Sequence, residues 1–557
     1  MYTIGVKFDK QNDIISSAFE LMKRHSGLYL IEEENRVADF FVALFLEKNM
    51  EKESYRIEKT DDAHISVYGA DFLGLVYGIG RMLHKGMEEI KDEQCTPKKH
   101  IRAVYYATHF GNFYQSAPIE EVIHHMEEQM LWGCNCIAMW FDMHHFCGID
   151  DPAAKKLLFR IRDVFSVAKS MGMKTSLTML ANEYYCGAPE NLLAQNSTEG
   201  TGYTKKMVGF YGTEICPSSV EGEALIISAR RKMLEFFKDT KLDFLLLWPY
   251  DQGGCTCSQC RPWGGKGFLE ISKKLSVLLR EFFPEAKCIL SAWRFDDFTT
   301  GEWDILLKEL NHLREYFDFI MADFAASETP EELHQYVKKA GMGLVGFPDI
   351  SMLATPWGGF GAAPATKHLN GVFEKNELNA DGGFCYSEGI FEDINKALML
   401  SLYMGNSTRE DVIRDYFRFY FGENTVEYAP ELIDGLEETL PRHRIGADGV
   451  INDYPFGETS DRLPVFEIKN KASVKRVREI AETLYCRVSD TVRESPRFLM
   501  LYLRAVIDFE LEKNQGNITD AIEEAAQRLK QIYYAEQADY VVSPITKKAI
   551  RENKGLI

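Results

Sequence analysis

The chain has 557 residues, of which 45% are hydrophobic and 12% aromatic, so it is long enough for about three or four globular domains. It carries 84 acidic against 64 basic residues, a formal net charge of −20 at pH 7. This acidity argues against nucleic-acid or anionic-membrane binding as the main task of the protein.

The N-terminal residues contain neither a basic segment nor a long apolar run, so we expect no signal peptide. No stretch approaches ~18 consecutive apolar residues, which predicts no transmembrane helix. In a chain without a leader, the 12 cysteines are expected to be reduced thiols. These features predict a cytoplasmic protein. The alternative is an external enzyme whose leader was removed. A homo-oligomer is compatible with the sequence.

Residues 1–100 are expected to form a small α/β domain. Strand-like stretches cover residues 3–7, 27–31, 40–46, 55–59 and 64–68, and helical periodicity covers 13–25 and 74–83. Gly74, Gly78 and Gly80 would let the second helix lie close against a sheet.

Residues 101–400 alternate between strand-like and helical stretches, which predicts a (β/α)8 TIM barrel. The connection from the third strand to the fourth is long, roughly 60 residues, and should fold over the C-terminal mouth of the barrel. The eight expected strands cover residues 101–108, 134–141, 174–180, 244–248, 287–292, 317–322, 343–347 and 383–386.

Strand signals fade after about residue 394, and residues 401–557 are expected to form a C-terminal helical domain. Ser407 and Thr408, followed by Glu410 and Asp411, resemble the capped, acidic first turn of a helix. Helical periodicity covers residues 394–404, 408–421, 426–440, 472–493, 497–513 and 519–536.

Side chains just past each predicted strand should line the barrel mouth, because parallel strands end on one face. They combine aromatic rings with carboxylate, amide and basic groups, the mixture that binds the faces and hydroxyls of a sugar. We therefore expect a carbohydrate substrate. The predicted substrate-binding residues are His109, Trp140, Asp142, His144, Asn182, Trp248, Tyr250, Trp293, Arg294, Asp323, Asp349, Trp357 and Tyr386.

Glycoside cleavage needs two carboxyl groups that flank the scissile bond, one protonated and one ionised. Asp251 after the fourth strand and Glu388 after the eighth are the leading candidates, because these strands face each other across the mouth. Glu183 is the third. The alternatives are a turn-forming role for Asp251, a salt bridge to Arg294 for Glu388, and hydroxyl binding or a scaffold role for Glu183.

A family resemblance covers roughly residues 1–420. The segment from residue 65 to 83 contains Gly-Leu-Val-Tyr-Gly-Ile after a Gly-Ala-Asp turn, and it resembles the domain that precedes the barrel in β-hexosaminidases and α-glucuronidases. The loop Tyr250-Asp-Gln-Gly-Gly-Cys-Thr-Cys257 resembles a bacterial branch of the same glycoside hydrolase superfamily. The resemblance implies an exo-acting glycosidase, hexosaminidase-like or glucuronidase-like, that requires no cofactor for catalysis.

One position departs from this pattern. β-Hexosaminidases carry an Asp-Glu pair after strand four, in which the Glu is the acid and the Asp orients the acetamido group of the substrate. Here the pair is Asp251-Gln252, and an amide cannot donate a proton as an acid. The departure argues against substrate-assisted hexosaminidase chemistry.

Three cysteines, Cys255, Cys257 and Cys260, have a spacing compatible with a metal site, and a structural zinc would need a fourth ligand. Cys216 is the first choice for that ligand and Cys186 the second. The alternative is a set of reduced loop cysteines without metal.

Two further functions remain open. A carbohydrate-binding protein on a hydrolase-like barrel would explain Gln252. A metal-dependent barrel hydrolase would use His144 and His145 beside Asp142, although the first strand lacks the H-x-H pair expected of that class.

Overall fold

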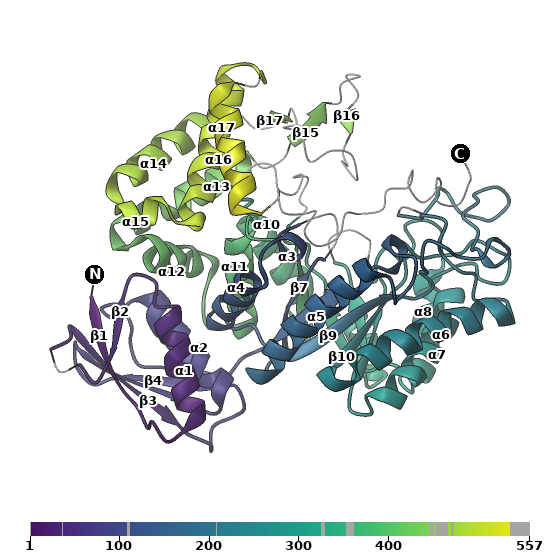
Figure 1. Ribbon diagram of the computed structural model, residues 1–557, viewed down its shortest axis with the longest axis horizontal. Coiled ribbons are helices and arrows are strands. Elements are labelled where there is room, and N and C mark those ends of the chain that lie inside the picture. Colours follow the sequence, from purple (N-terminus) through teal and green to yellow (C-terminus); the bar gives the residue numbers. More distant parts are fainter. Residues whose placement is uncertain are drawn as a thin grey trace.

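The computed structural model describes residues 2–35, 37–108, 112–207, 209–324, 329–351, 361–439, 442–445, 451–452, 466–468, 473–517 and 519–534. In this part of the chain a six-stranded sheet comes first, a closed eight-stranded barrel follows, and helices with a small three-stranded sheet come last (Figure 1). The predicted fold class is confirmed. No helix among the described residues is long and apolar enough to cross a membrane.

The barrel consists of eight strands in which almost every residue is buried, as expected of parallel strands covered on both faces. Neighbouring strands pair in parallel, and β14 pairs with β7 to close the ring. All eight lie where the sequence predicts them. They are β7 (Ile101–Tyr106), β8 (Cys136–Trp140), β9 (Lys174–Leu180), β10 (Phe244–Trp248), β11 (Lys287–Ser291), β12 (Phe319–Ala322), β13 (Gly343–Gly346) and β14 (Gly382–Ser387).

Helices cover the outside of the barrel, and several begin at side-chain caps. Asp151 accepts a hydrogen bond from the amide of Ala153, and Ser219 accepts one from Gly222. The helices are α3 (Phe113–Ser116), α4 (Ile119–Leu131), α5 (Pro152–Ser170), α6 (Val220–Phe237), α7 (Gly267–Phe282), α8 (Glu302–Leu313), α9 (Leu333–Lys339), α10 (Thr366–Val372) and α11 (Asp393–Met404). Shorter helical turns are η1 (Met143–His145), η2 (Glu190–Leu192), η3 (Lys238–Thr240) and η4 (Phe373–Glu377).

The N-terminal sheet has the strand order β2-β1-β3-β5-β4-β6. The second strand begins at Leu30 rather than residue 27, because Gly27 has φ +60° and belongs to the preceding turn. The sixth strand is polar in sequence and was not predicted. The elements are β1 (Thr3–Lys7), α1 (Asp13–Arg24), β2 (Leu30–Glu33), β3 (Phe40–Leu46), β4 (Tyr55–Lys59), β5 (His64–Gly69), α2 (Phe72–Lys85) and β6 (Glu93–Cys95).

The glycines of α2 allow close backbone contacts on two sides. A Cβ on Gly74 would lie 2.2 Å from the Ser54 carbonyl oxygen at the sheet, as the sequence suggests. A Cβ on Gly80 would lie 2.1 Å from the carbonyl oxygen of Leu131, the last residue of α4. Gly80 therefore serves the contact between the N-terminal domain and the barrel, not the contact with the sheet.

The C-terminal region contains the predicted helices and a small sheet that the sequence did not predict. Thr408 and Asp411 form a complete capping box at the start of α12. The predicted helix over residues 472–493 is divided, because Ser489 caps a new turn by accepting from the amide of Val492. The elements are α12 (Arg409–Phe421), η5 (Glu423–Tyr428), α13 (Ala429–Glu438), β15 (Arg442–Ile445), β16 (Ile451–Asn452), β17 (Phe466–Ile468), α14 (Val474–Arg487), α15 (Asp490–Arg493), α16 (Pro496–Lys513) and α17 (Asp520–Ile532).

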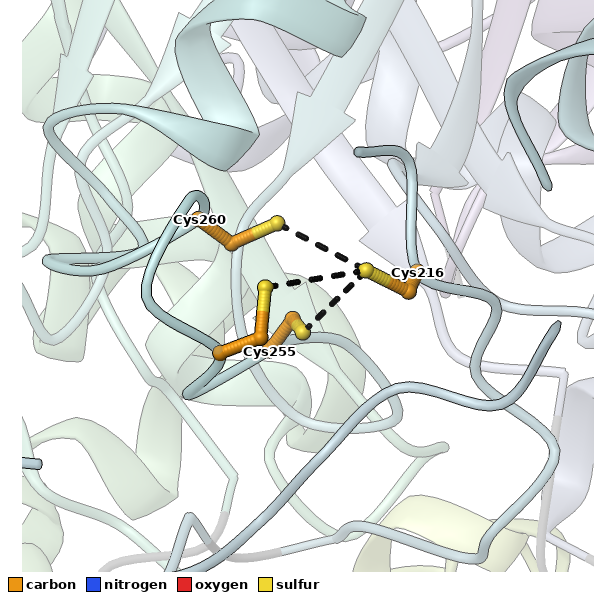
Figure 2. A group of neighbouring side chains, drawn as sticks. Cys216, Cys255 and Cys260 are labelled. Atoms are coloured by element: carbon orange, nitrogen blue, oxygen red, sulfur yellow. Dashed lines mark hydrogen bonds between the residues drawn. The ribbon is translucent and has the colours of Figure 1, made fainter. Parts of the chain in front are cut away.

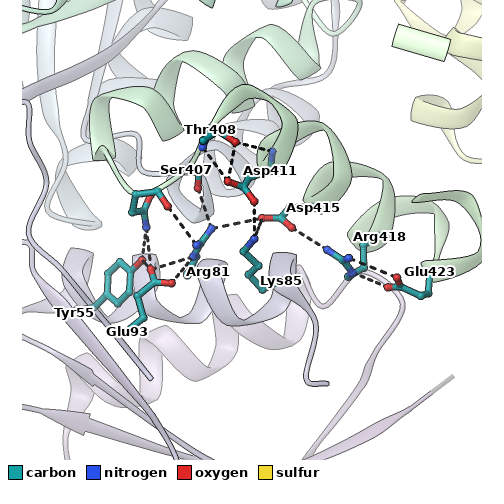
Figure 3. A network of polar contacts seen from close by, with 11 residues as sticks. Tyr55, Arg81, Lys85, Glu93, Ser407, Thr408, Asp411, Asp415, Arg418 and Glu423 are labelled. Atoms are coloured by element: carbon teal, nitrogen blue, oxygen red, sulfur yellow. Dashed lines mark hydrogen bonds and ion pairs between the residues drawn. The ribbon is translucent and has the colours of Figure 1, made fainter. Parts of the chain in front are cut away.

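A polar network joins α2 of the N-terminal domain to α12 of the C-terminal region (Figure 3). The carboxylate of Asp415 lies 3.5 Å from Arg81, 3.4 Å from Lys85 and 2.9 Å from Arg418. Arg81 also contacts Glu93 at 3.0 Å. Asp415 is buried, so its charge depends on these three cations.

We expect Gly80→Ala to destabilise the protein by about 1–3 kcal/mol, because the added methyl group forces α2 away from the end of α4. Gly371→Ala is the matched control, since Gly371 also lies in a helix and a Cβ there meets nothing within 4 Å. Thermal unfolding of both variants measures the difference. An unchanged melting temperature for Gly80→Ala would contradict the close packing of these two helices.

Candidate active site

The mouth of the barrel lies at the carboxyl ends of the eight parallel strands. In the closed strand order, β10 and β14 stand four positions apart and so lie on opposite sides of the ring. Asp251 follows β10 and Glu388 follows β14. The strands that precede the two candidate carboxylates therefore stand on opposite sides of the barrel.

Glu388 is a buried carboxyl group at the turn after β14, with 3% of its surface exposed. Its Oε1 accepts a hydrogen bond of 3.0 Å from the hydroxyl of Tyr386. Burial, followed by the negative charges of Glu392 and Asp349, raises the pKa of Glu388 well above its ordinary value. The group therefore keeps its proton at a pH where an exposed glutamate is ionised.

The turn that carries Glu388 is held by Glu392. One carboxylate oxygen of Glu392 accepts from the Ser387 hydroxyl at 2.9 Å and from the amides of Glu388 and Gly389 at 2.6 and 2.7 Å. The hydroxyl of Tyr533, just after α17, donates to the Glu388 carbonyl oxygen at 2.6 Å. The C-terminal helical region thus reaches the candidate site.

Asp251 lies in the connection after β10, in an uncommon backbone conformation. Asp251 has φ +59° and Gln252 φ +67°, both in the left-handed region that non-glycine residues seldom adopt. Asn182, after β9, holds the connection: its Oδ1 accepts from the Gly254 amide at 2.9 Å, and its Nδ2 donates to the carbonyl oxygens of Gly254 and Ile215, both at 2.9 Å. The predicted substrate-binding amide of Asn182 is thus engaged with backbone groups.

A second group of polar side chains lies at the ends of β8 and β9. His145 Nε2 is 2.8 Å from a carboxylate oxygen of Asp142. The Oε1 of Glu183 lies 2.7 Å from His144 Nδ1 and accepts from the His144 amide at 3.1 Å. Burial raises the pKa of Glu183 to about 7, although the nearby Arg230 guanidinium opposes this rise.

Tyr211, from the long insertion between β9 and β10, covers this second group. Its ring stacks on His144 with centroids 4.4 Å apart. Burial first, and then the charge of Asp251, raises the pKa of Tyr211, while a hydrogen bond with Gln252 opposes the rise. A Cβ on Gly209 would lie 2.2 Å from Asp251 Oδ1, so the insertion backbone contacts Asp251 directly. The insertion therefore folds over the mouth, as expected from its place in the chain.

Aromatic rings pack against one another inside the barrel, between the two sides. The ring of Phe347 lies 4.6 Å from Trp248 and 5.7 Å from Tyr386, and Tyr105 lies 5.5 Å from Tyr386. Trp293 extends this set beside Trp248 at 5.3 Å. Burial raises the pKa of Tyr105, and the negative charges of three nearby carboxylates raise it further. These are Asp142, Asp251 and Glu183.

Some predicted binding residues have other partners. Tyr250 is fully buried and its hydroxyl donates to Glu302, so it packs behind the mouth. One alternative for Glu388 was a salt bridge to Arg294. Arg294 instead donates to Asp297 at 2.6 Å.

The remaining predicted residues are distributed as follows. Trp140 and Asp323 are buried at the ends of β8 and β12. The backbone of Asp349 forms an isolated parallel β-bridge with Tyr386, and its side-chain Oδ1 accepts a hydrogen bond from the Ser351 amide at 3.0 Å. His109 and Trp357 lie outside the described residues.

Four cysteines converge beside the connection after β10 (Figure 2). Their sulfur atoms all lie within 4.8 Å of one another, and they are the four predicted metal ligands: Cys216, Cys255, Cys257 and Cys260. Cys186, the second choice for the fourth ligand, lies outside this group, and its sulfur is 3.0 Å from that of Cys147. A second metal-compatible group consists of Asp142, His144 and His145.

Sequence reasoning missed several residues of the site. The length of the insertion predicts a loop over the mouth, but nothing in the sequence indicates that Tyr211 in this loop contacts His144. Arg230, in the middle of α6, donates to the carbonyl oxygens of Leu180 and Glu183 at 2.5 and 2.8 Å. Nothing in the sequence distinguishes it from a surface arginine.

No known sequence family matches the chain, and no curated protein matches it. Solved structures match at low sequence identity. A GH138 enzyme targeting pectin rhamnogalacturonan II is 12% identical, with a TM-score of 0.53 over 97% of this chain and 93% of its own. A GH115 4-O-methyl-α-glucuronidase with specificity for decorated arabinogalactans is 10% identical, with a TM-score of 0.57 over 99% of this chain and 78% of its own.

A family 89 glycoside hydrolase from Clostridium perfringens is 12% identical, with a TM-score of 0.58 over 93% of this chain and 64% of its own. All three identities are too low to carry residue roles from one chain to another. The protein therefore has the fold of these glycoside hydrolases.

Proposed function

We propose that the protein is a glycoside hydrolase that cleaves a glycosidic bond with two carboxyl groups, Glu388 and Asp251. The observation that carries this proposal is their placement after β14 and β10, strands on opposite sides of the barrel with packed aromatic rings between them. Glycosidases place an acid and an ionised carboxylate on the two sides of the scissile bond.

The two groups have different environments, which favours different roles. Glu388 is buried near two other carboxylates and holds its proton, so it is the general acid that protonates the leaving oxygen. Asp251 is only partly buried and is the ionised partner, either as the nucleophile or as the base that activates water. Glu183 is the alternative acid, because its pKa of about 7 also favours a proton near neutral pH.

The shape of the mouth favours exo action. The insertion places Tyr211 over His144 and brings Gly209 against Asp251, so one side of the mouth is closed. A closed side suits the end of a glycan better than its middle. Partly exposed rings of Trp293 and Tyr386 offer faces for the sugar C–H groups.

The sugar belongs to the classes that the family resemblance of the sequence implies, hexosaminides or glucuronides. Gln252 stands where β-hexosaminidases carry their acid, and its side chain contacts Tyr211. This favours a substrate whose cleavage does not depend on an acetamido group. A panel of aryl glycosides that includes both classes, and α and β anomers of each, would identify the sugar.

A metal-dependent hydrolase is the second candidate function. Asp142, His144 and His145 each offer a ligand atom, and these atoms lie within 4.8 Å of one another. The Nε2 atom of His144 is buried without a hydrogen-bond partner, which suits a ligand atom.

Glu388→Gln should lower kcat/KM on an unactivated glycoside by about 10²–10⁴-fold, because the leaving oxygen loses its proton donor. The loss should be much smaller on a dinitrophenyl glycoside, whose leaving group needs no proton. Asp251→Asn should lower kcat/KM on both substrates. Steady-state kinetics measure these differences, with Asp163→Asn, a surface residue paired with Arg162, as the matched control.

Near-full activity of both variants on the true substrate would show that the acid and its partner lie elsewhere. Glycan binding by the unmodified protein without any turnover would support a carbohydrate-binding protein instead.

The activity of the unmodified protein should fall as the pH rises through the pKa of Glu388, because the acid must be protonated. Since that pKa is raised well above 4.5, the alkaline limb of the pH–rate profile should lie far above pH 4.5. Glu388→Gln should remove this limb on a dinitrophenyl glycoside. If Glu183→Gln removes it instead, Glu183 is the acid.

Metal removal distinguishes the second candidate function. If carboxyl groups alone perform the reaction, His144→Ala and His145→Ala should bind as much metal as the unmodified protein. If these variants lose one metal equivalent, and added metal restores the activity of stripped unmodified protein, the metal-dependent reaction is correct. Metal analysis beside activity measurements separates the two outcomes.

A further inference from the structure

The four cysteines come from two separate segments of the chain, and Figure 2 labels three of them, Cys216, Cys255 and Cys260. Cys255, Cys257 and Cys260 belong to the connection between β10 and α7, and Cys216 belongs to the insertion, just before α6. The sequence separations from Cys216 are 39, 41 and 44 residues. Their meeting is therefore a property of the tertiary fold, which the spacing of the three cysteines alone does not show.

The sulfur positions fit a tetrahedral site. A zinc–sulfur bond of ~2.3 Å makes each edge of a sulfur tetrahedron about 3.8 Å long. Cys216 Sγ lies 3.6 Å from Cys255 Sγ, 3.8 Å from Cys257 Sγ and 3.9 Å from Cys260 Sγ. A disulfide would instead bring one pair to about 2.05 Å and leave the other two sulfur atoms aside.

The surroundings suit thiolate ligands. The hydroxyl of Ser218 lies within hydrogen-bonding distance of two of the sulfur atoms, 3.0 Å from Cys216 Sγ and 3.8 Å from Cys257 Sγ. Such outer hydrogen bonds stabilise the charge on metal-bound sulfur. Cys255 and Cys260 are buried and the other two are partly exposed, so solvent reaches one side of the site.

We propose that Cys216, Cys255, Cys257 and Cys260 bind one structural zinc ion. Four thiolates complete the coordination of zinc and leave no open position for a substrate, so the ion has no part in the reaction. Its effect is to join the insertion to the connection after β10. This proposal does not depend on the proposed glycosidase activity.

The position of the ion explains how the loop of Asp251 is fixed. Asp251 and Gln252 are held on one side by β10 and on the other by Gly254, which Asn182 binds, and Cys255 comes next. Without an ion, the four thiols contribute only weak contacts to this loop. With it, the loop and the insertion that carries Tyr211 are fixed at a single point.

The test is metal analysis of the full chain purified under reducing conditions. We expect about one zinc per chain, and after replacement by Co²⁺ the sulfur-to-cobalt charge-transfer absorption of a thiolate site. Cys216→Ser and Cys257→Ser, at the two partly exposed ligands, should each lower zinc retention by at least about tenfold. Cys486→Ser is the matched control, because Cys486 is exposed on α14, and it should retain zinc fully.

If the ligand variants do not fold, competition between a chromophoric chelator and the unmodified protein gives the zinc affinity directly. The proposal is overturned if reduced, metal-stripped protein takes up no zinc, if the two variants retain zinc like Cys486→Ser, or if thiol counting on denatured protein shows disulfides among these cysteines. Asp251→Asn should keep its zinc while losing activity. A failure of the proposed enzymatic function is therefore distinguishable from a failure of the metal site.

Discussion

The candidate site depends on the side chain of Asn182. This fully buried amide makes three hydrogen bonds to backbone groups of two segments, the insertion at Ile215 and the connection after β10 at Gly254. Buried backbone groups that lose a partner cost about 1–3 kcal/mol each. A single side chain at the end of β9 thus binds both segments, the one that carries Tyr211 and the one that carries Asp251.

The barrel strands provide a rigid frame, but the polar groups of the mouth are oriented by contacts from outside it. Glu392 accepts three hydrogen bonds from the turn of Glu388, and Tyr533 donates to the same turn from the C-terminal region. On the other side, Arg230 of α6 binds the carbonyl oxygen of Glu183. These paired buried donors and acceptors keep the turn of Glu388 and the end of β9 in fixed positions, which proton transfer requires.

The barrel could be predicted because its strands are apolar runs with turn residues after them. Once the strands were known, the positions of Asp251 and Glu388 on opposite sides of the mouth followed. The orientation of residues after a strand could not be predicted in the same way. Tyr250 directly precedes Asp251, yet it turns toward Glu302, which lies 52 positions further along the chain.

The contacts of the insertion and of the C-terminal region could not be predicted either, because their partners are distant in the sequence. Tyr211 reaches His144 and Tyr533 reaches Glu388, and neither has a local pattern that indicates its partner. The strands β15 to β17 are too short for a periodic signal, with four, two and three residues. Local patterns thus predict the elements, whereas tertiary partners decide which side chains meet.

The network between α2 and α12 has a consequence for the biosynthesis of the protein. Arg81 and Asp415 are separated by 334 positions, with the whole barrel between them. At a translation rate of about 5–20 residues per second, roughly 15 to 70 s pass between the synthesis of the two residues. During that interval the nascent N-terminal domain leaves the ribosome with Arg81 and Lys85 still lacking this carboxylate. The domain must therefore remain soluble before the last part of its interface has been translated.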